Sequence, residues 1–287
     1  MTNEVPNQLP IFQLPYDWQT IDEVVSKKAG GAIIQSLLST EQLNALNEQI
    51  DLYLEECPEV GLPKSGSSRY DRFLGLRTIR FHGLAEKFSL SRSLISDPRV
   101  IAWAQRMMAP KATSIQLNAG ELIQIGPDEP AQFPHRDTDS WPLPLGGAPI
   151  IVNAIVALDD FTLENGATYI VPESWQWPET RKAEPEDYVR AVMNAGDAVF
   201  FRGDLIHHGG ENKSSLPRRG ISLSYCLGWL RPVENSFLNV SRETAKTLAA
   251  PLQDLLGYAA HDGAALKSGM VGLFENGDPR RALAKAE

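Results

Sequence analysis

Ile150-Ile-Val-Asn-Ala-Ile-Val-Ala-Leu158 is a nearly continuous apolar run in the middle of the chain. Its length and its β-branched residues predict a buried strand. Four other segments are also short and bounded by turn-forming residues, and we predict strands at 114–125, 167–172, 197–201 and 220–229. Many short strands with turns between them are typical of a barrel or a double-sheet jelly roll. We therefore expect a mainly β protein with flanking helices.

Helical patterns lie on both sides of this predicted β-core. Ser39 is placed to cap a helix, Gln42 completes a capping box three residues later, and Pro58 lies just past the helix end. Apolar residues recur at near-helical spacing between these signals. Further helices are predicted near 95–108, near 185–194 and around 242–257.

The order of these elements predicts one structural domain that spans 1–287. A helical layer at about 1–112 would pack on a β-core at about 113–230, and a C-terminal extension at about 231–287 would follow. The helices would cover one face of a sheet, and the other face would line a pocket. Residues 1–30 are expected to wrap the surface.

Composition excludes several functional classes. The formal net charge is −9 and the basic residues are scattered, which argues against a nucleic-acid partner. No apolar run approaches the roughly 18 residues of a membrane span, and the N-terminus has no pattern of a secretory signal. We expect a cytoplasmic protein in which Cys57 and Cys226 are both free thiols.

His135-Arg136-Asp137 contains two side chains that can bind one metal ion together. On a strand, residues two apart point to the same face, so Arg136 would point away. A third ligand must come from elsewhere, and His207 and His208 are adjacent, so only one of them can face inward. Two histidines and one carboxylate form the facial triad of non-haem Fe(II), which leaves positions open for a co-substrate and O₂.

Three longer segments carry a family resemblance. They are Phe133-Pro-His135-Arg-Asp137-Thr, Glu164-Asn-Gly-Ala-Thr168-Tyr-Ile-Val-Pro172-Glu-Ser and Leu205-Ile-His207-His-Gly-Gly-Glu-Asn212-Lys-Ser-Ser-Leu-Pro-Arg218-Arg-Gly. Together they resemble the phytanoyl-CoA dioxygenase (PhyH-like) family of Fe(II)/2-oxoglutarate oxygenases. The tail Ser224-Tyr-Cys-Leu-Gly-Trp-Leu-Arg-Pro-Val-Glu-Asn235 is similar to a branch that tailors meroterpenoids and alkaloids. Matching segments run from about residue 30 to 258.

The resemblance implies a double-stranded β-helix core of cupin-like, jelly-roll type, and it implies the roles of the main site residues. His135, Asp137 and His207 would be the catalytic iron ligands. We favour His207 over His208 because Leu-Ile-His and the later Gly-x-Asn then fall in the family register. Arg218 would anchor the far carboxylate of 2-oxoglutarate, since a guanidinium matches carboxylate geometry and stays charged. The shifted register would use His208 with Arg219.

Three further residues are implied in co-substrate binding. The hydroxyl of Thr168 would donate a hydrogen bond to 2-oxoglutarate, although an ordinary strand threonine fits the same pattern. Gln132 lies three residues before His135 and would also hydrogen-bond the co-substrate. Arg80 resembles a basic position at the edge of the pocket, and Arg77 is a rival for that role.

The implied activity is that of an Fe(II)- and 2-oxoglutarate-dependent dioxygenase that uses O₂ to oxidise an unactivated C–H bond. The substrate would be an apolar small molecule of terpenoid or meroterpenoid secondary metabolism, and the enzyme could be a homodimer. Hydroxylation, desaturation, rearrangement and endoperoxidation all fit. Halogenation is disfavoured, because halogenases replace the carboxylate with a small residue and this chain retains Asp137.

Two other classes of protein stay open on the residues alone. One is a cupin-like isomerase or hydrolase that uses Zn or Mn as a Lewis acid. The other is a β-barrel binding module without catalysis.

Among the aromatic residues near the motifs, Trp141 is a candidate to line the substrate pocket. Tyr225 is expected to pack in the core rather than donate a hydrogen atom.

Overall fold

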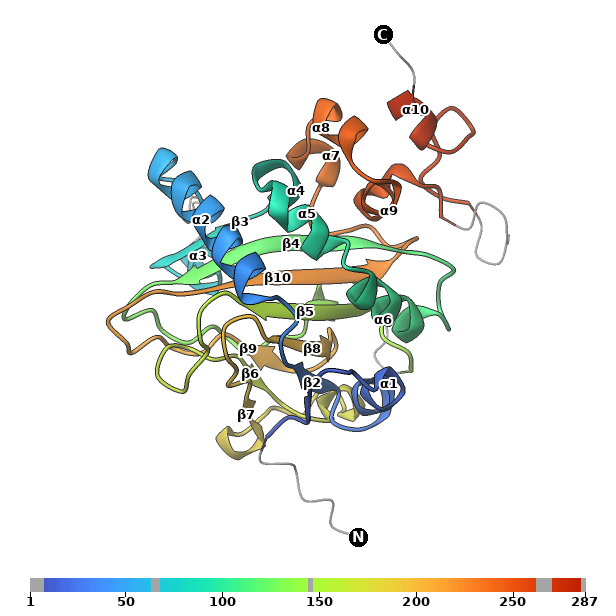
Figure 1. Ribbon diagram of the computed structural model, residues 1–287. Helices are drawn as coiled ribbons and strands as arrows, with labels where there is room; N and C mark the ends of the chain where they lie inside the picture. The colour runs from blue at the N-terminus through green and yellow to red at the C-terminus, as the bar shows by residue number, and fades with distance from the viewer. Residues whose placement is uncertain (1–7, 63–67, 144–146, 262–269, 285–287) are drawn as a thin grey trace.

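Two β-sheets form the centre of the computed structural model, which describes residues 8–62, 68–143, 147–261 and 270–284. The larger sheet has seven strands in the order β1 (Ile11–Phe12), β2 (Gly31–Ile34), β8 (Ala198–Arg202), β5 (Ile151–Ala157), β10 (Arg218–Leu227), β4 (Ile115–Ile125) and β3 (Thr78–Phe81). The smaller sheet has the order β7 (Val189–Arg190), β6 (Tyr169–Ile170) and β9 (His207–His208). The predicted double-sheet core with flanking helices is confirmed (Figure 1).

Strand β10 shows how the large sheet separates core from cavity. Ile221, Leu223 and Tyr225 are fully buried in the main hydrophobic cluster. Ser222 and Ser224, on the alternate face, line a cavity. This alternation follows from the strand period of two. The expectation that one face packs on helices while the other lines a pocket is confirmed.

The helices that cover the large sheet include the first one predicted from the sequence. Helix α2 (Thr40–Glu56) begins after Ser39, and both hydrogen bonds of the capping box with Gln42 are present. Figure 1 shows α2, α5 (Ser89–Ile95) and α6 (Pro98–Met108) across the near face of the sheet. From α6, the buried Trp103 ring packs against Phe200 of β8, with the ring centroids 4.5 Å apart.

The remaining helices are short. They are α1 (Trp18–Lys27), α3 (Ser68–Leu74), α4 (Leu84–Lys87), α7 (Ser236–Asn239), α8 (Arg242–Thr247), α9 (Ala250–Gln253) and α10 (Arg280–Ala284). Single turns of 3-10 or π-helix are η1 (Asp137–Ser140), η2 (Ser174–Gln176), η3 (Pro185–Asp187) and η4 (Asp254–Tyr258). The helices predicted around 242–257 are confirmed by α8, α9 and η4.

The N-terminal region departs from the predicted helical layer. Strands β1, β2 and β3 all lie before residue 113, and they form both edges of the large sheet, so the β-core is not confined to 113–230. Residues 1–30 do not only wrap the surface. In α1, Ile21 and Val25 are fully buried, because the helix is amphipathic and lays its apolar face on the core.

The helix predicted at 185–194 is wrong. Pro185 starts only one 3-10 turn, η3, and the chain then extends. Val189 pairs with Ile170, and Arg190 pairs with Tyr169, in an antiparallel ladder. Sheet pairing and the burial of Val189 therefore outweigh the local helical pattern.

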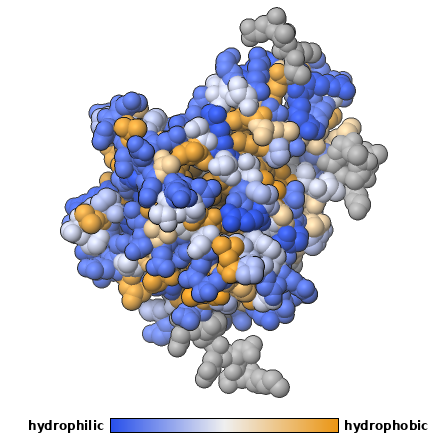
Figure 2. All heavy atoms as spheres, viewed as in Figure 1, coloured by the Kyte–Doolittle hydropathy of each residue, from blue (hydrophilic) through white to orange (hydrophobic). Residues whose placement is uncertain are grey.

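Hydrophilic residues cover most of the face shown in Figure 2, and apolar residues gather in smaller groups between them. Within the described ranges, no helix is both long enough and apolar enough to cross a membrane. Cys57 and Cys226 are both free thiols, as predicted.

Candidate metal and co-substrate site

A cavity of about 440 Å³ opens between the inner faces of the two sheets. Strands β4, β5 and β10 supply one wall, and β9 with the segment before β6 supplies the other. Tyr70, Phe73 and Leu74 of helix α3 also line the cavity. The cavity therefore lies on the side of the large sheet that the main helical layer leaves uncovered.

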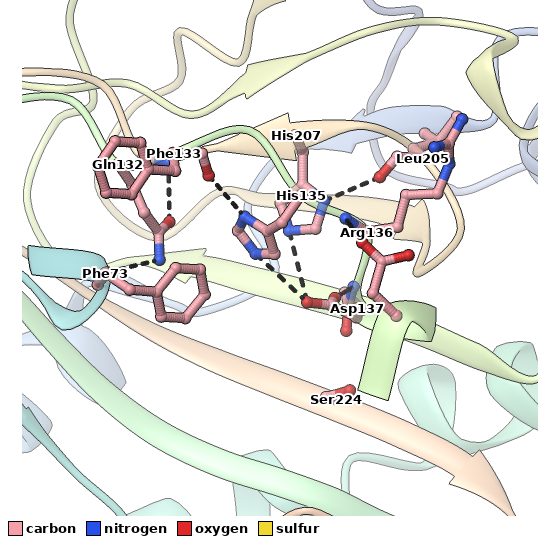
Figure 3. A network of polar contacts seen from close by, with 12 residues as sticks. Phe73, Gln132, Phe133, His135, Arg136, Asp137, Leu205, His207 and Ser224 are labelled. Carbon is pink, nitrogen blue, oxygen red and sulfur yellow. Dashed lines mark hydrogen bonds and ion pairs between the residues drawn. The ribbon is translucent and has the colours of Figure 1, made fainter. Parts of the chain in front are cut away.

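His135, Asp137 and His207 meet in this cavity (Figure 3). One ligand atom from each residue lies within 4.8 Å of the others, and this is the one such group of three in the described part of the chain. The Nε2 atoms of His135 and His207 lie 3.6 Å and 3.7 Å from Oδ1 of Asp137. The backbones of His135 and His207 also exchange two hydrogen bonds, of 3.1 Å and 3.0 Å. An antiparallel bridge thus brings two distant segments together.

Backbone carbonyls fix the tautomers of both imidazoles. Nδ1 of His135 lies 3.0 Å from the carbonyl oxygen of Phe133. Nδ1 of His207 lies 3.0 Å from the carbonyl oxygen of Leu205. A carbonyl can only accept, so each Nδ1 carries the proton and each Nε2 presents a lone pair to the shared space.

The protonation states of Asp137 and His207 suit a metal ion, whereas the hydrogen bond and charge of Asp137 outweigh burial and raise the pKa of His135. Burial raises the pKa of Asp137, but His207, His135 and the side-chain amide of Asn153 outweigh burial and lower the pKa to about 2. Burial lowers the pKa of His207 to about 4, against the attraction of Asp137. At neutral pH the carboxylate is ionised and His207 is neutral, which is the state in which these groups bind metals.

His208 lies outside this group. Its Nδ1 lies 2.9 Å from the carbonyl oxygen of Gly209, and its ring stacks on Tyr169 at a centroid distance of 4.5 Å. Tyr188 contacts the ring edge-on. Neighbouring strand residues point to opposite faces, so only His207 turns toward Asp137.

Arg218, the first residue of β10, is a buried cation in the wall of the same cavity, with 3% of its surface exposed. One Nη2 hydrogen bond goes to the carbonyl oxygen of Gly166, whereas the buried Nε has no partner. Within the described residues no carboxylate forms an ion pair with it, and its guanidinium lies 3.9 Å from the centroid of the Phe161 ring. Burial, and then repulsion by Arg80, lowers the pKa of Arg218 to about 9 against the attraction of Asp159, so the charge is still present at neutral pH.

Arg219 points to the opposite face of the sheet. Its guanidinium contacts Asp51 at 2.6 Å, Gln124 at 2.8 Å and Asn47 at 3.0 Å. Its charge is therefore paired on the helical side, away from the cavity. The structure brings together His207 and Arg218, and it brings neither His208 nor Arg219 to the site.

Thr168 and Gln132 both line the cavity. Thr168 is buried with 3% exposure and precedes β6. The Gln132 amide donates to the carbonyl oxygen of Phe73 at 3.0 Å and accepts from the backbone N–H of Gly209 at 3.2 Å. An amide nitrogen has two N–H groups, so one remains for a ligand.

The two candidate arginines near the pocket edge differ in position. Arg80 of β3 lines the cavity, and its Nη1 lies 3.0 Å from Oε2 of Glu121. Arg77 forms an exposed ion pair with Asp128 at 3.1 Å and does not line the cavity. Of the two, the position of Arg80 matches the predicted role.

The two aromatic residues named from the sequence pack away from the cavity. Trp141 does not line it, and its Nε1 instead donates to the carbonyl oxygen of Arg231 at 3.1 Å. Tyr225 is fully buried on the helical face, where its hydroxyl donates to the carbonyl oxygen of Ile95 at 2.7 Å. The packing role expected for Tyr225 agrees with this contact.

Asn153 is a site residue that the sequence analysis missed. Its Nδ2 donates to Oδ2 of Asp137 at 2.6 Å, and it lines the cavity from β5. Asn153 is the one polar residue within the apolar run 150–158. A polar residue alone in a buried strand was the sequence signal that could have identified it as a site residue. Glu121, Asn118, Ser222 and Ser224 were also missed, because polar residues on an alternating strand look like ordinary solvent-facing positions.

Residues 26–220 match the family model for phytanoyl-CoA dioxygenase (PhyH). The chain belongs to the phytanoyl-CoA dioxygenase family. It is 30% identical over 267 residues to "Dioxygenase FUM3" of Gibberella moniliformis, and the aligned region covers 89% of this chain and 88% of that protein. It is also 29% identical over 248 residues to "Iron/alpha-ketoglutarate-dependent dioxygenase penM" of Penicillium thymicola. That aligned region covers 84% of this chain and 77% of that protein. The predicted family, the enzyme class and the cofactors iron and 2-oxoglutarate are thereby confirmed.

Solved structures share the fold of this dioxygenase. The epimerase SnoN, in complex with Fe3+, alpha ketoglutarate and nogalamycin RO, aligns with a TM-score of 0.58 and 22% identity over 77% of this chain and 88% of that one. The carbocyclase SnoK from nogalamycin biosynthesis aligns with a TM-score of 0.60 and 20% identity, over 77% of this chain and 89% of that one. These likenesses support the predicted jelly-roll, cupin-like core.

Proposed function

We propose that this protein holds Fe(II) at His135, Asp137 and His207, binds 2-oxoglutarate against Arg218, and oxidises a C–H bond of a small natural product. One observation carries the proposal: an open group of metal ligands and a buried cation without a carboxylate partner line the same cavity.

The residues present fit both groups. Two histidines and one ionised carboxylate are the ligand set of non-haem Fe(II) oxygenases, and three positions stay open for other ligands. A buried unpaired guanidinium is costly unless an anion compensates it. The unpartnered Nε of Arg218 therefore supports a carboxylate of 2-oxoglutarate as its partner.

Bound iron and 2-oxoglutarate would supply the oxidation: O₂ and 2-oxoglutarate would give succinate and CO₂, and the second oxygen atom would enter the substrate in a hydroxylation or leave as water in a desaturation. The chain's own residues bind, orient and shield these reactants. We propose that Thr168, the remaining N–H of Gln132 and Arg80 contact the co-substrate beside Arg218. The ion pair between Arg80 and Glu121 keeps Arg80 in place, whereas Arg218 forms no ion pair with the described residues and is the proposed anchor.

The cavity also bounds the substrate. A volume of about 440 Å³ fits a small organic molecule. Apolar and polar groups share its lining, with Tyr70, Phe73 and Val233 on one hand and Asn118 and Ser224 on the other. We therefore propose a substrate with an apolar framework and a few hydrogen-bonding groups, rather than a wholly apolar one. This description suits an oxygenated terpenoid or meroterpenoid, and hydroxylation, desaturation, rearrangement and endoperoxidation stay open.

The other two classes are less well supported. A Zn or Mn isomerase or hydrolase is not favoured by the match to the phytanoyl-CoA dioxygenase family. A binding module without catalysis would not need the ionised carboxylate and the oriented Nε2 atoms that the site presents.

The decisive experiment measures succinate from 2-oxoglutarate in air with Fe(II) added back to the metal-free protein. We expect succinate that depends on Fe(II), and we compare His207→Ala with His208→Ala. Loss of an outer-shell partner typically costs about 10- to 100-fold. Loss of the ligand His207 should cost at least that much, whereas His208→Ala should stay within a few-fold of the wild type. Succinate formation without Fe(II), or a larger loss in His208→Ala, would contradict the proposal.

A further inference from the structure

Asn153 lies at the centre of the large sheet and faces the cavity. It is 2% exposed, and its neighbours along β5 are buried apolar residues. Its backbone is fixed from both sides, because it pairs with Phe201 of β8 and with Ser224 of β10. A buried amide in such a strand is costly unless its polar atoms are satisfied.

The two oxygens of Asp137 have different partners. Oδ1 lies 3.6 Å and 3.7 Å from the Nε2 atoms of His135 and His207. Oδ2 accepts a 2.6 Å hydrogen bond from Nδ2 of Asn153. The carboxylate can only accept, so the nitrogen of the amide must face it. The bond therefore occupies the oxygen that does not face the histidines.

The backbone of Asp137 is held as firmly as its side chain. Its N–H donates to the carbonyl oxygen of Gly203 at 2.9 Å, and Gly203 directly follows β8. Asp137 and Asn153 are thus both tied to the same region of the large sheet. The carboxylate has little freedom to turn its second oxygen toward the other ligands.

We propose that Asn153 is a positioning residue that restricts Asp137 to one metal-binding oxygen and so keeps a coordination position open for the co-substrate. A carboxylate can bind a metal through one oxygen or through two. Three protein ligands leave three positions on an octahedral ion, of which 2-oxoglutarate needs two and O₂ one. A second bond from Asp137 would take one of them. This inference rests on the proposed iron site.

The test replaces Asn153 by Leu, which has a similar size but no hydrogen-bond donor, and by Ala as a smaller variant. Fe(II) and 2-oxoglutarate are titrated without O₂, and the visible charge-transfer band of 2-oxoglutarate chelated to Fe(II) is recorded. We expect both variants to bind Fe(II) about 10- to 100-fold more weakly. At saturating Fe(II), we expect the band to be weaker and to need about tenfold more 2-oxoglutarate.

Asn47→Ala is the matched control. Asn47 also uses its side-chain amide, which donates to the carbonyl oxygen of Leu158 at 3.0 Å and accepts from Arg219 at 3.0 Å, but it lies outside the cavity. Circular dichroism and thermal unfolding of the metal-free proteins establish that each variant is folded. A purely structural role for Asn153 predicts lower stability with an unchanged band, as expected for Asn47→Ala.

The outcomes separate the two proposals. If the wild type forms no band, the proposed iron and 2-oxoglutarate site fails. If the wild type forms the band and the folded Asn153 variants match it in Fe(II) affinity, band intensity and 2-oxoglutarate requirement, the role of Asn153 is overturned while the proposed function stands.

Discussion

At the scale of single residues, Arg218 has unfavourable surroundings when no anion is bound beside it. Its guanidinium is buried, and among the described residues its Nε has no hydrogen-bond partner and no carboxylate forms an ion pair with it. The carboxylate of Asp159 attracts it only without direct contact. The Phe161 ring and the carbonyl oxygen of Gly166 compensate only in part. A group that binds an incoming anion well therefore costs stability while the anion is absent.

We predict that Arg218→Met stabilises the metal-free protein by about 1 kcal/mol or more, because an uncompensated buried charge is replaced by an apolar chain of similar length. The same change should abolish the further stabilisation that 2-oxoglutarate gives in the presence of Mn(II). Thermal unfolding with a chelator, and then with Mn(II) and 2-oxoglutarate, measures both effects.

Arg219→Met is the control for this prediction. It removes the neighbouring guanidinium, which is paired with Asp51 on the opposite face, so it should not stabilise the protein. Its response to 2-oxoglutarate should equal that of the wild type. A lower unfolding temperature for metal-free Arg218→Met would mean that Phe161 and Gly166 already compensate the charge.

The site could be predicted from the sequence only where a residue belongs to a motif. His135, Asp137, His207 and Arg218 lie in segments whose spacing carries the family pattern, and the structure brings all four to one cavity. Asn153 belongs to no such motif. Its partner Asp137 lies in a different segment, so the hydrogen bond becomes visible only once β5 and the segment of Asp137 meet in space.

At the scale of elements, long strands were predictable and very short ones were not. Strands β4, β5 and β10 have 11, 7 and 10 residues, enough for alternation or an apolar run to show. Strands β6, β7 and β9 have two residues each, too few for a periodicity to show. Of these, β6 lies within the strand predicted at 167–172 from its bounding turn residues, whereas β7 and β9 were not predicted. They exist because they pair with one another, and this pairing also explains why the predicted helix at 185–194 was wrong.

The turn at Asn165-Gly166 connects this small sheet to Arg218. Gly166 has φ +93°, a conformation that favours glycine, and its carbonyl oxygen accepts the hydrogen bond from Arg218. A Cβ at Gly166 would lie 2.8 Å from the carbonyl oxygen of Gly210. The turn therefore sets the position of Arg218, the proposed co-substrate anchor, as well as the path of the chain.

We predict that Gly166→Ala destabilises the protein by about 1–2 kcal/mol through the positive φ alone, with a further cost from the contact with Gly210. It should also raise the KM for 2-oxoglutarate, because the carbonyl group that holds Arg218 must shift. Thermal unfolding and succinate kinetics measure the two effects.

Gly147→Ala is the control that separates the cost of a positive φ from an effect on the position of Arg218. Gly147 also has a positive φ, +71°, but a Cβ there would meet no atom of the described residues within 4 Å. The two variants should share the cost of the positive φ, and only Gly166→Ala should change the KM for 2-oxoglutarate. An unchanged KM in Gly166→Ala would show that the turn does not position Arg218.

At the scale of the whole molecule, the site depends on contacts between the two sheets. His207 lies in the small sheet, Arg218 and Asn153 lie in the large sheet, and His135 and Asp137 lie between β4 and β5. Order and spacing of motifs could predict that these segments meet. They could not predict that N-terminal strands form both edges of the large sheet, because β2 and β3 have only four residues each.

Ligands that connect both sheets should stabilise the fold as a whole. At ligand concentrations one hundred times Kd, binding to the folded state alone adds about 2.7 kcal/mol. For a chain of 287 residues, that gain corresponds to a rise of about 4–5 °C in Tm. We therefore predict such a rise when Mn(II) and 2-oxoglutarate are added together, and its reversal by a chelator.

Asp137→Ala should show no rise under the same conditions, because it removes the carboxylate ligand and leaves Arg218 unchanged. If Asp137→Ala responded as strongly as the wild type, the metal would be stabilising the protein from some place other than the cavity between the sheets.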